Sequence, residues 1–105
     1  MSAIIALCTC PDEPTAEGIA NALVGERLAA CVNRVASVVS TYRWKDEVQR
    51  DSEQLLIIKT TRERFDALCD RIVALHPYEL PEVIAVDVAA GLDPYLAWIV
   101  RETRA

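Results

Sequence analysis

The chain has 105 residues, which suffices for one domain and is short for two, so we expect a single domain spanning residues 1–105. Its 16 acidic residues outnumber its 11 basic residues and give a formal net charge of −5. Nucleic acids and anionic membranes are bound through concentrated Lys and Arg, and no basic run is present, so we expect neither as a partner. The sequence shows no signal peptide and no apolar run long enough to span a membrane, so we expect a cytoplasmic protein.

The first half of the chain is predicted to form a strand, a helix and a hairpin. Residues 3–9 are a short apolar run, which is typical of a buried strand. Asp12 caps a helix that continues through Ala-rich sequence to about residue 30. Residues 31–44 and 48–60 are rich in β-branched and aromatic side chains and are separated by a polar turn, so they form a long hairpin.

A helix, a strand and a final helix are predicted in the second half. Thr61 is the N-cap of the first helix, and Pro77 ends it because the residue before a proline is driven out of the α region. Residues 83–88 form the strand, and Asp93 caps the final helix, which begins with Pro94. The first of these helices has one apolar face, made of Phe65, Leu68, Cys69, Ile72, Val73 and His76.

This order of elements predicts an α+β fold with a ferredoxin-like βαββαβ arrangement, a long central hairpin and an extra C-terminal helix. Such a sheet carries two helices on one face, and its other face is exposed in a monomer. The hairpin adds exposed apolar side chains to that surface, namely Val38, Tyr42, Trp44 and Val48. Because an uncovered apolar sheet favours aggregation, we expect several copies to assemble sheet to sheet.

The candidate metal ligands lie at two points of this arrangement. Cys8 and Cys10 come near the end of the first strand, where alternation places both on the same face. Thiolates favour Cu(I), so Cys8 is a candidate ligand, and the alternative is a thiol packed in the core. His76, the only histidine, ends the amphipathic helix and is either a ligand or a partner of the helix dipole. The four cysteines show no C-x-x-C spacing of a zinc site.

Other candidate residues are charged or aromatic. Lys59 follows four apolar residues, and it either pairs with a carboxylate such as Glu53 or Glu82 or binds an anion in a cleft. We find no nucleophile elbow, Gly-rich phosphate loop or H-E-x-x-H motif, so we do not expect an enzyme. Most of the aromatic mass is expected in the core or at an interface, and it consists of Tyr42, Trp44, Tyr78, Tyr95 and Trp98.

Several short motifs, in one order over nearly the whole chain, resemble the CutA family of divalent-cation tolerance proteins. The resemblance implies a ferredoxin-like fold, a homotrimer with the architecture of the PII signalling proteins, and a link to tolerance of copper and divalent cations. The motifs are Leu7-Cys8-Thr9, Pro11-Asp12-Glu13, Leu28-Ala29-Ala30-Cys31-Val32-Asn33, Tyr42-Arg43-Trp44-Lys45, Ile58-Lys59-Thr60, His76-Pro77-Tyr78-Glu79-Leu80-Pro81-Glu82 and Tyr95-Leu96-Ala97-Trp98.

The resemblance also bears on individual positions. The ligands proposed for copper-binding members of the family match Cys8 and His76, together with a second histidine whose position is held here by Leu75. Asp46 stands where the family commonly has a turn glycine, and because Asp tolerates the left-handed conformation the hairpin should form.

We therefore expect a homotrimer that binds copper or another divalent cation through Cys8 and His76 at clefts between subunits. The alternatives are a very stable trimeric scaffold for a protein partner and a PII-like signalling module that binds a small anionic ligand. The residues expected to line the cleft are Lys59, Tyr78, Glu82 and Glu53, and those expected at the interface are Tyr42, Trp44 and Trp98.

Overall fold

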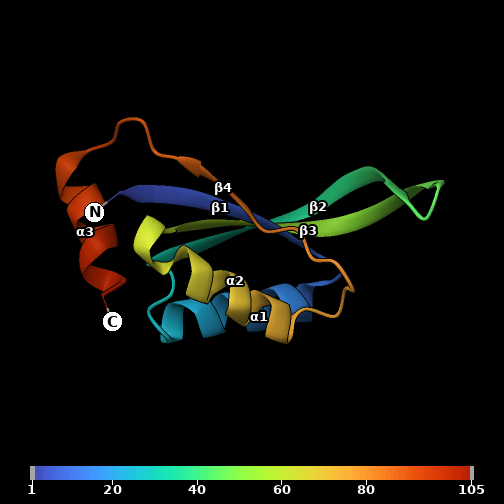
Figure 1. Cartoon of the computed structure of the whole chain (residues 1–105), viewed down its shortest axis with the longest axis horizontal. Helices are drawn as coiled ribbons and strands as arrows, with labels where there is room; N and C mark the ends of the chain where they lie inside the picture. Colours follow the sequence, from blue (N-terminus) through green and yellow to red (C-terminus); the bar gives the residue numbers. More distant parts are fainter. Residues whose placement is uncertain (1, 105) are drawn as a thin grey trace.

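A computed structural model describes residues 2–104 as a four-stranded antiparallel sheet with two helices packed against one face (Figure 1). The strands lie in the order β2-β3-β1-β4, and a third helix lies at the end of the sheet where β1 begins (Figure 1). The predicted ferredoxin-like α+β arrangement is confirmed. The elements are β1 Ala3–Cys10, α1 Glu13–Gly25, β2 Cys31–Trp44, β3 Glu47–Thr61, a 3₁₀ turn Arg62–Arg64, α2 Phe65–Leu75, β4 Ile84–Asp87 and α3 Asp93–Glu102.

The core lies between the sheet and helices α1 and α2. Strand β1 is central, paired with β3 on one side and with β4 on the other. Its side chains alternate, so every second one is buried against the helices. Burying one Leu or Ile side chain contributes about 1.5–3 kcal/mol, so these contacts hold the two layers together. The buried residues are Ala6, Cys8 and Cys10 of β1, Ala16, Ile19 and Leu23 of α1, Leu56 and Ile58 of β3, and Leu68 and Ile72 of α2.

Helix α1 begins as predicted and ends earlier than predicted. The Asp12 carboxylate accepts a hydrogen bond of 2.8 Å from the backbone N–H of Thr15, which caps the first turn. The prediction that the helix reaches residue 30 is wrong, because the helix ends at Gly25. Arg27 then takes a left-handed conformation with φ 58°, and the chain turns through buried residues 28–30 into β2.

The start of α2 and its apolar face differ from the prediction, whereas its end agrees. Thr61 makes no side-chain cap, because the 3₁₀ turn comes between it and α2. Val73 is 60% exposed, so the buried stripe is narrower than the spacing indicates. His76 has extended backbone angles immediately before Pro77, as expected for a residue that precedes proline. The imidazole therefore leaves the helix axis and turns toward the sheet.

Helix α3 begins one residue earlier than predicted. Asp93 is its first residue rather than its cap, and Leu92 holds the N-cap position without a side-chain hydrogen bond. Pro94 lies in the first turn, where its missing N–H costs least.

The hairpin of β2 and β3 extends well beyond the helices (Figure 1). Lys45 and Asp46 form its two-residue turn, with φ values of 49° and 67°, which are typical of a type I′ connection. Asp46 thus adopts the left-handed conformation expected of it. Tyr42 and Val48 are exposed as predicted, whereas Trp44 is half-buried. The Tyr42 hydroxyl donates a hydrogen bond to the carboxylate of Asp51 on the opposite arm.

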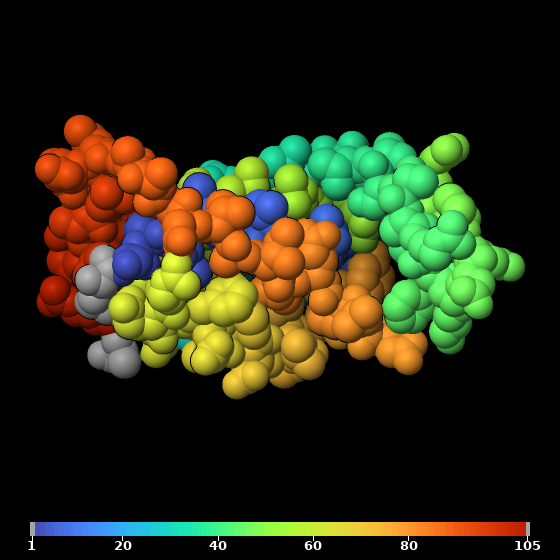
Figure 2. Space-filling model, turned by 45° about the horizontal axis from the view of Figure 1, so that its top comes forward, coloured from blue at the N-terminus to red at the C-terminus, as the bar shows by residue number. Residues whose placement is uncertain are grey.

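The second face of the sheet carries no helix among residues 2–104, and we call it the open face (Figures 1 and 2). The strand register identifies the residues of the open face, because paired residues of antiparallel strands project from the same face of the sheet. Ile84 and Val86 are each 54% exposed, so solvent reaches much of this apolar surface in the single chain. The apolar members of the open face are Ile5, Leu7, Val35, Leu55, Ile57, Ile84 and Val86.

The cap of α1 predicts a pH-dependent contribution to stability. The hydrogen bond from Thr15 lowers the pKa of Asp12 in the folded state. The charged carboxylate therefore stabilises the fold at pH values above the ordinary Asp pKa of about 4. This contribution is lost as the pH falls through the lowered pKa of the folded state. Asp12→Asn keeps a capping oxygen without the charge. Thermal unfolding followed by circular dichroism should show wild type more stable than Asp12→Asn at pH 7, with the difference shrinking toward pH 3. Glu17→Gln, an exposed change in the same helix, is the control, and an Asp12→Asn difference independent of pH would contradict this account.

Candidate metal centre

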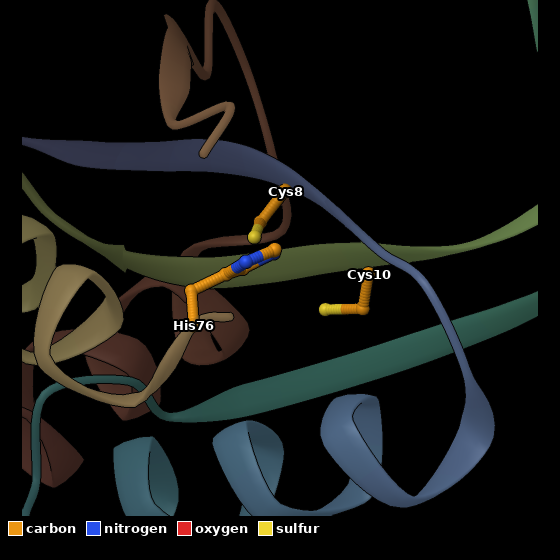
Figure 3. A group of neighbouring side chains, drawn as sticks. All are labelled: Cys8, Cys10 and His76. Carbon is orange, nitrogen blue, oxygen red and sulfur yellow. The ribbon is translucent and has the colours of Figure 1, made fainter. Parts of the chain in front are cut away.

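Three side chains that carry potential metal-ligand atoms meet where β1 ends. Cys8 and Cys10 project from β1 toward the helices, and His76 approaches them from the C-terminal end of α2 (Figure 3). Each offers one ligand atom, and these atoms all lie within 4.8 Å of one another. Both cysteines are 0% exposed and His76 is 7% exposed. The structure therefore brings the two predicted ligands, Cys8 and His76, together inside one chain and adds Cys10.

Hydrogen bonds fix the His76 ring. Its Nδ1 accepts a hydrogen bond of 3.2 Å from the backbone N–H of Tyr78. The proton must then reside on Nε2, which lies 2.8 Å from the carbonyl oxygen of Thr9 and donates to it. The Tyr78 ring packs against the imidazole with a centroid separation of 4.6 Å. Both ring nitrogens are thus engaged, so a metal ion must replace one of these two partners.

The two thiols influence each other. The hydrogen bond between them, together with burial and the nearby carboxylates of Glu82 and Glu53, raises the pKa of Cys8. The same hydrogen bond lowers the pKa of Cys10. Cys10 is therefore the thiol of the pair with the lower pKa, and the Cys8 Sγ lies 3.8 Å from the Thr9 carbonyl oxygen.

A buried carboxylate adjoins the cluster. Glu53 of β3 is 5% exposed, and its Oε2 accepts a hydrogen bond of 2.7 Å from the hydroxyl of Tyr78. Burial of the phenol, followed by this hydrogen bond, raises the pKa of Tyr78. Tyr78 thus connects the histidine segment to the hairpin: its backbone contacts His76 and its side chain contacts Glu53. Glu82, the other predicted acidic residue, is exposed.

The ion pair of Lys59 with Glu53 or Glu82, one of the two alternatives for this residue, is not formed among residues 2–104. Lys59 lies in β3 opposite Cys31 and on the face away from the helices. Its Nζ donates to the Asn33 side-chain oxygen and lies 4.0 Å from the Cys31 sulfur. Within one chain, Lys59 is therefore separated from the Cys8–Cys10–His76 cluster by the sheet.

The residues predicted at an interface lie at opposite ends of the molecule (Figure 1). Tyr42 and Trp44 belong to the outer part of the hairpin. Trp98 belongs to α3 and packs against Tyr95 with a ring separation of 5.5 Å. A single chain does not bring these groups together.

Sequence reasoning placed Cys10 beside Cys8 but did not include it among the ligands. The available signal was the C-x-C spacing in a predicted strand, because residues two apart in a strand share a face. The spacing alone does not reveal that a histidine 66 positions further along packs against the same face.

The fold and this cluster describe a small α+β protein with a thiol–imidazole group near the end of its central strand. A model of the CutA1 divalent ion tolerance protein family matches residues 4–102, and the chain belongs to this family. The divalent-cation tolerance protein CutA of Thermus thermophilus is 50% identical over 99 residues, covering 94% of this chain and 96% of the relative. A solved structure of the protein from that organism superposes with a TM-score of 0.95 at 48% identity, covering 97% of this chain and 99% of the other.

Further relatives carry names that indicate different compartments. A chloroplastic CutA of Arabidopsis thaliana is 44% identical over 101 residues, and the match covers 96% of this chain but 56% of the relative. The solved structure of a periplasmic divalent cation tolerance protein from Archaeoglobus fulgidus has a TM-score of 0.94 at 31% identity, with 97% of this chain and 99% of the other covered. None of the described helices of the present chain is long and apolar enough to cross a membrane. These names describe tolerance of cations, not a catalysed reaction.

The contact between Tyr78 and Glu53 gives a testable contribution to stability. Tyr78→Phe removes the hydroxyl that satisfies a buried carboxylate, and leaving such a group unpaired costs about 1–3 kcal/mol. We expect the thermal midpoint to fall by several degrees. Tyr95→Phe, which removes a hydroxyl from an exposed ring on α3, is the matched control. Equal midpoints for the two variants would show that Glu53 does not depend on Tyr78.

Proposed function

We propose that this protein is a non-catalytic, cytoplasmic homotrimer of single-domain chains that binds copper or another divalent cation and so contributes to metal tolerance. The observation that carries the proposal is the approach of Cys8 and His76 to within 4.8 Å from two different elements. Thiolate and imidazole are ligands that suit copper, which forms the most stable complexes among the divalent ions of its row. Membership in the CutA1 family supports a role in tolerance.

Metal binding at Cys8 and His76 requires two changes in the cluster. His76 must give up one hydrogen bond, to Thr9 or to Tyr78, and can keep the other as an orienting contact. The Cys8 thiol must also lose its proton when it binds a metal ion. Ion binding therefore replaces a few weak hydrogen bonds by metal–ligand bonds without refolding the chain.

The trimer is supported by the open face and by the two aromatic ends. Partly exposed Ile84 and Val86 continue an apolar surface that another copy can cover. The hairpin with Trp44 and helix α3 with Trp98 lie at opposite ends of the molecule. A contact between the hairpin of one copy and α3 of the next would therefore join two different surfaces. Such head-to-tail contacts close into rings, as a cyclic trimer requires. We assign Tyr78, its hydrogen-bond partner Glu53, Glu82 and Lys59 to the proposed clefts between subunits.

Copper titration tests the ligands. The reduced protein should bind copper saturably, and Cys8→Ser or His76→Ala should weaken binding at least about tenfold, because each removes a ligand atom. Cys69→Ser, which changes a thiol of α2 outside the cluster, should bind like wild type. The mass in solution is measured alongside, so that a lost ligand is distinguished from a lost assembly. A trimer that binds no copper, or binds it equally in every variant, would refute this site and favour the scaffold or the small-ligand alternative.

Substitution on the open face tests the trimer. Wild type should have three times the chain mass of 11.6 kDa in analytical ultracentrifugation. Val86→Asp places a charge in the proposed interface and should shift the protein toward monomer, because an unpaired buried charge is strongly unfavourable. Val73→Asp is the matched control, since Val73 is similarly exposed but lies on α2 in the helical layer. If wild type is monomeric, or if Val86→Asp remains trimeric, the open face is not the interface.

A further inference from the structure

We propose that Lys59, Thr61 and Asn33 form a binding site for a small oxyanion, of the phosphate or carboxylate type, on the open face beside α3. The site lies on the opposite side of the sheet from the candidate metal centre and shares no residue with it. The inference goes beyond the proposed metal binding, because it gives a ligand to Lys59, which the proposed function assigns only to the clefts between subunits.

Lys59 is a cation on a surface that offers it no counter-charge. The register places it in one row across the sheet with Cys31, Ile5 and Val86, and none of these side chains is acidic. Among residues 2–104, Lys59 forms no ion pair. The positive potential of the ammonium group is therefore not cancelled by its neighbours on the open face, and it attracts an anion.

A buried hydroxyl lies beside this cation. Thr61 follows Lys59 by two residues in β3, so the two side chains project from the same face. Thr61 is 0% exposed, and its Oγ1 has no hydrogen-bond partner in the described structure. Thr60, on the helical side, instead donates a hydrogen bond of 2.7 Å to the carbonyl oxygen of Leu28. Because a buried hydroxyl without a partner is unfavourable, a ligand that accepts its hydrogen bond gains affinity there.

The spacing of these groups suits a small oxyanion. Side chains two residues apart in a strand are separated by about 6.6 Å. Two hydrogen bonds of about 2.8 Å each, made to different oxygens of one anion, span this separation. The flexible stem of Lys59 lets its ammonium group reach an anion that lies over β3. Because α3 packs at this end of the sheet, the space next to Thr61 favours a small ligand (Figure 1).

Asn33 holds the ammonium group and adds a further donor. Its side-chain oxygen accepts a hydrogen bond from the Lys59 Nζ, which leaves its amide N–H groups available. Asn33 is exposed and lies in the edge strand β2. An ammonium group, a hydroxyl and an amide, each able to donate, complement a ligand that carries negative charge and only accepts hydrogen bonds.

Anion binding at Lys59 also affects how the open face can be covered. If another copy covers this face, the ammonium group loses water, and a buried charge without a partner is strongly unfavourable. A bound oxyanion supplies the missing counter-charge. We therefore expect the anion to stabilise the covered form of the open face rather than to compete with it.

The experiment is a calorimetric titration of the metal-free protein with inorganic phosphate, at constant pH and at an ionic strength set with chloride. A parallel titration with acetate distinguishes a carboxylate ligand from a phosphate ligand. Wild type should bind one of the two saturably and should gain thermal stability as its concentration rises. Lys59→Met keeps most of the stem without the charge and should weaken binding at least about tenfold. Lys45→Met, which removes the same charge from the hairpin turn, is the matched control and should bind like wild type.

Thr61→Val separates a role in binding from a role in folding. The change replaces the hydroxyl by a methyl group of similar size. Because this hydroxyl has no partner in the chain, the variant should be at least as stable as wild type without the anion, yet bind the anion roughly tenfold more weakly. A variant that is destabilised without the anion and binds it unchanged would refute the role of Thr61.

The remaining outcomes distinguish this inference from the proposed function. If neither anion binds wild type, or if Lys59→Met binds as tightly as Lys45→Met, the oxyanion site is refuted, and copper binding at Cys8 and His76 remains to be judged by its own titration. If no anion binds and Lys59→Met dissociates the assembly, a carboxylate of a neighbouring copy supplies the counter-charge. In that case the inference fails and the assembly is retained.

Discussion

The alternation of side chains along β1 is the constraint on which the rest of the structure depends. This strand lies between β3 and β4, so its register is fixed on both edges. Cys8 and Cys10 consequently face the helices, while Ile5 and Leu7 face away from them. A slip of one residue would exchange the two sets, placing the thiols on the open face and separating them from His76. The same period of two therefore determines both the Cys8–Cys10–His76 cluster and the apolar open face.

Much of the fold could be predicted because local sequence and tertiary structure agree. Pro77 ends α2, Asp12 caps α1, and the β-branched runs form the hairpin as expected. The errors fall where packing overrides local preference. Residues after Gly25 have helical propensity, but the left-handed turn at Arg27 is imposed by the need to bring the chain back into β2. Val73 satisfies the helical spacing, yet α2 buries only a narrow stripe against the sheet.

The site was predictable in its residue types but not in its contacts. Sequence singled out Cys8 and His76, while the decisive fact is that the end of α2 packs against the end of β1. The expected pairing of Lys59 with Glu53 failed for a geometric reason: six residues along an extended strand span about 20 Å. The nearest neighbours of Lys59 are instead cross-strand residues, Cys31 and Asn33. Ligand sets that join distant segments require the fold before they can be recognised.

The polar groups of the cluster are hydrogen-bonded within the chain, and this shapes how metal binding relates to folding. The Thr9 carbonyl accepts from His76 and lies near the Cys8 thiol, and the Tyr78 N–H occupies the second ring nitrogen. Buried polar groups satisfied in this way do not need an ion to fold, unlike ligand sets whose folding free energy is the metal-binding free energy. Metal affinity then equals the gain in coordination minus the loss of these contacts. At the proposed site an ion would therefore bind to a chain that is already folded, and its release would not require unfolding.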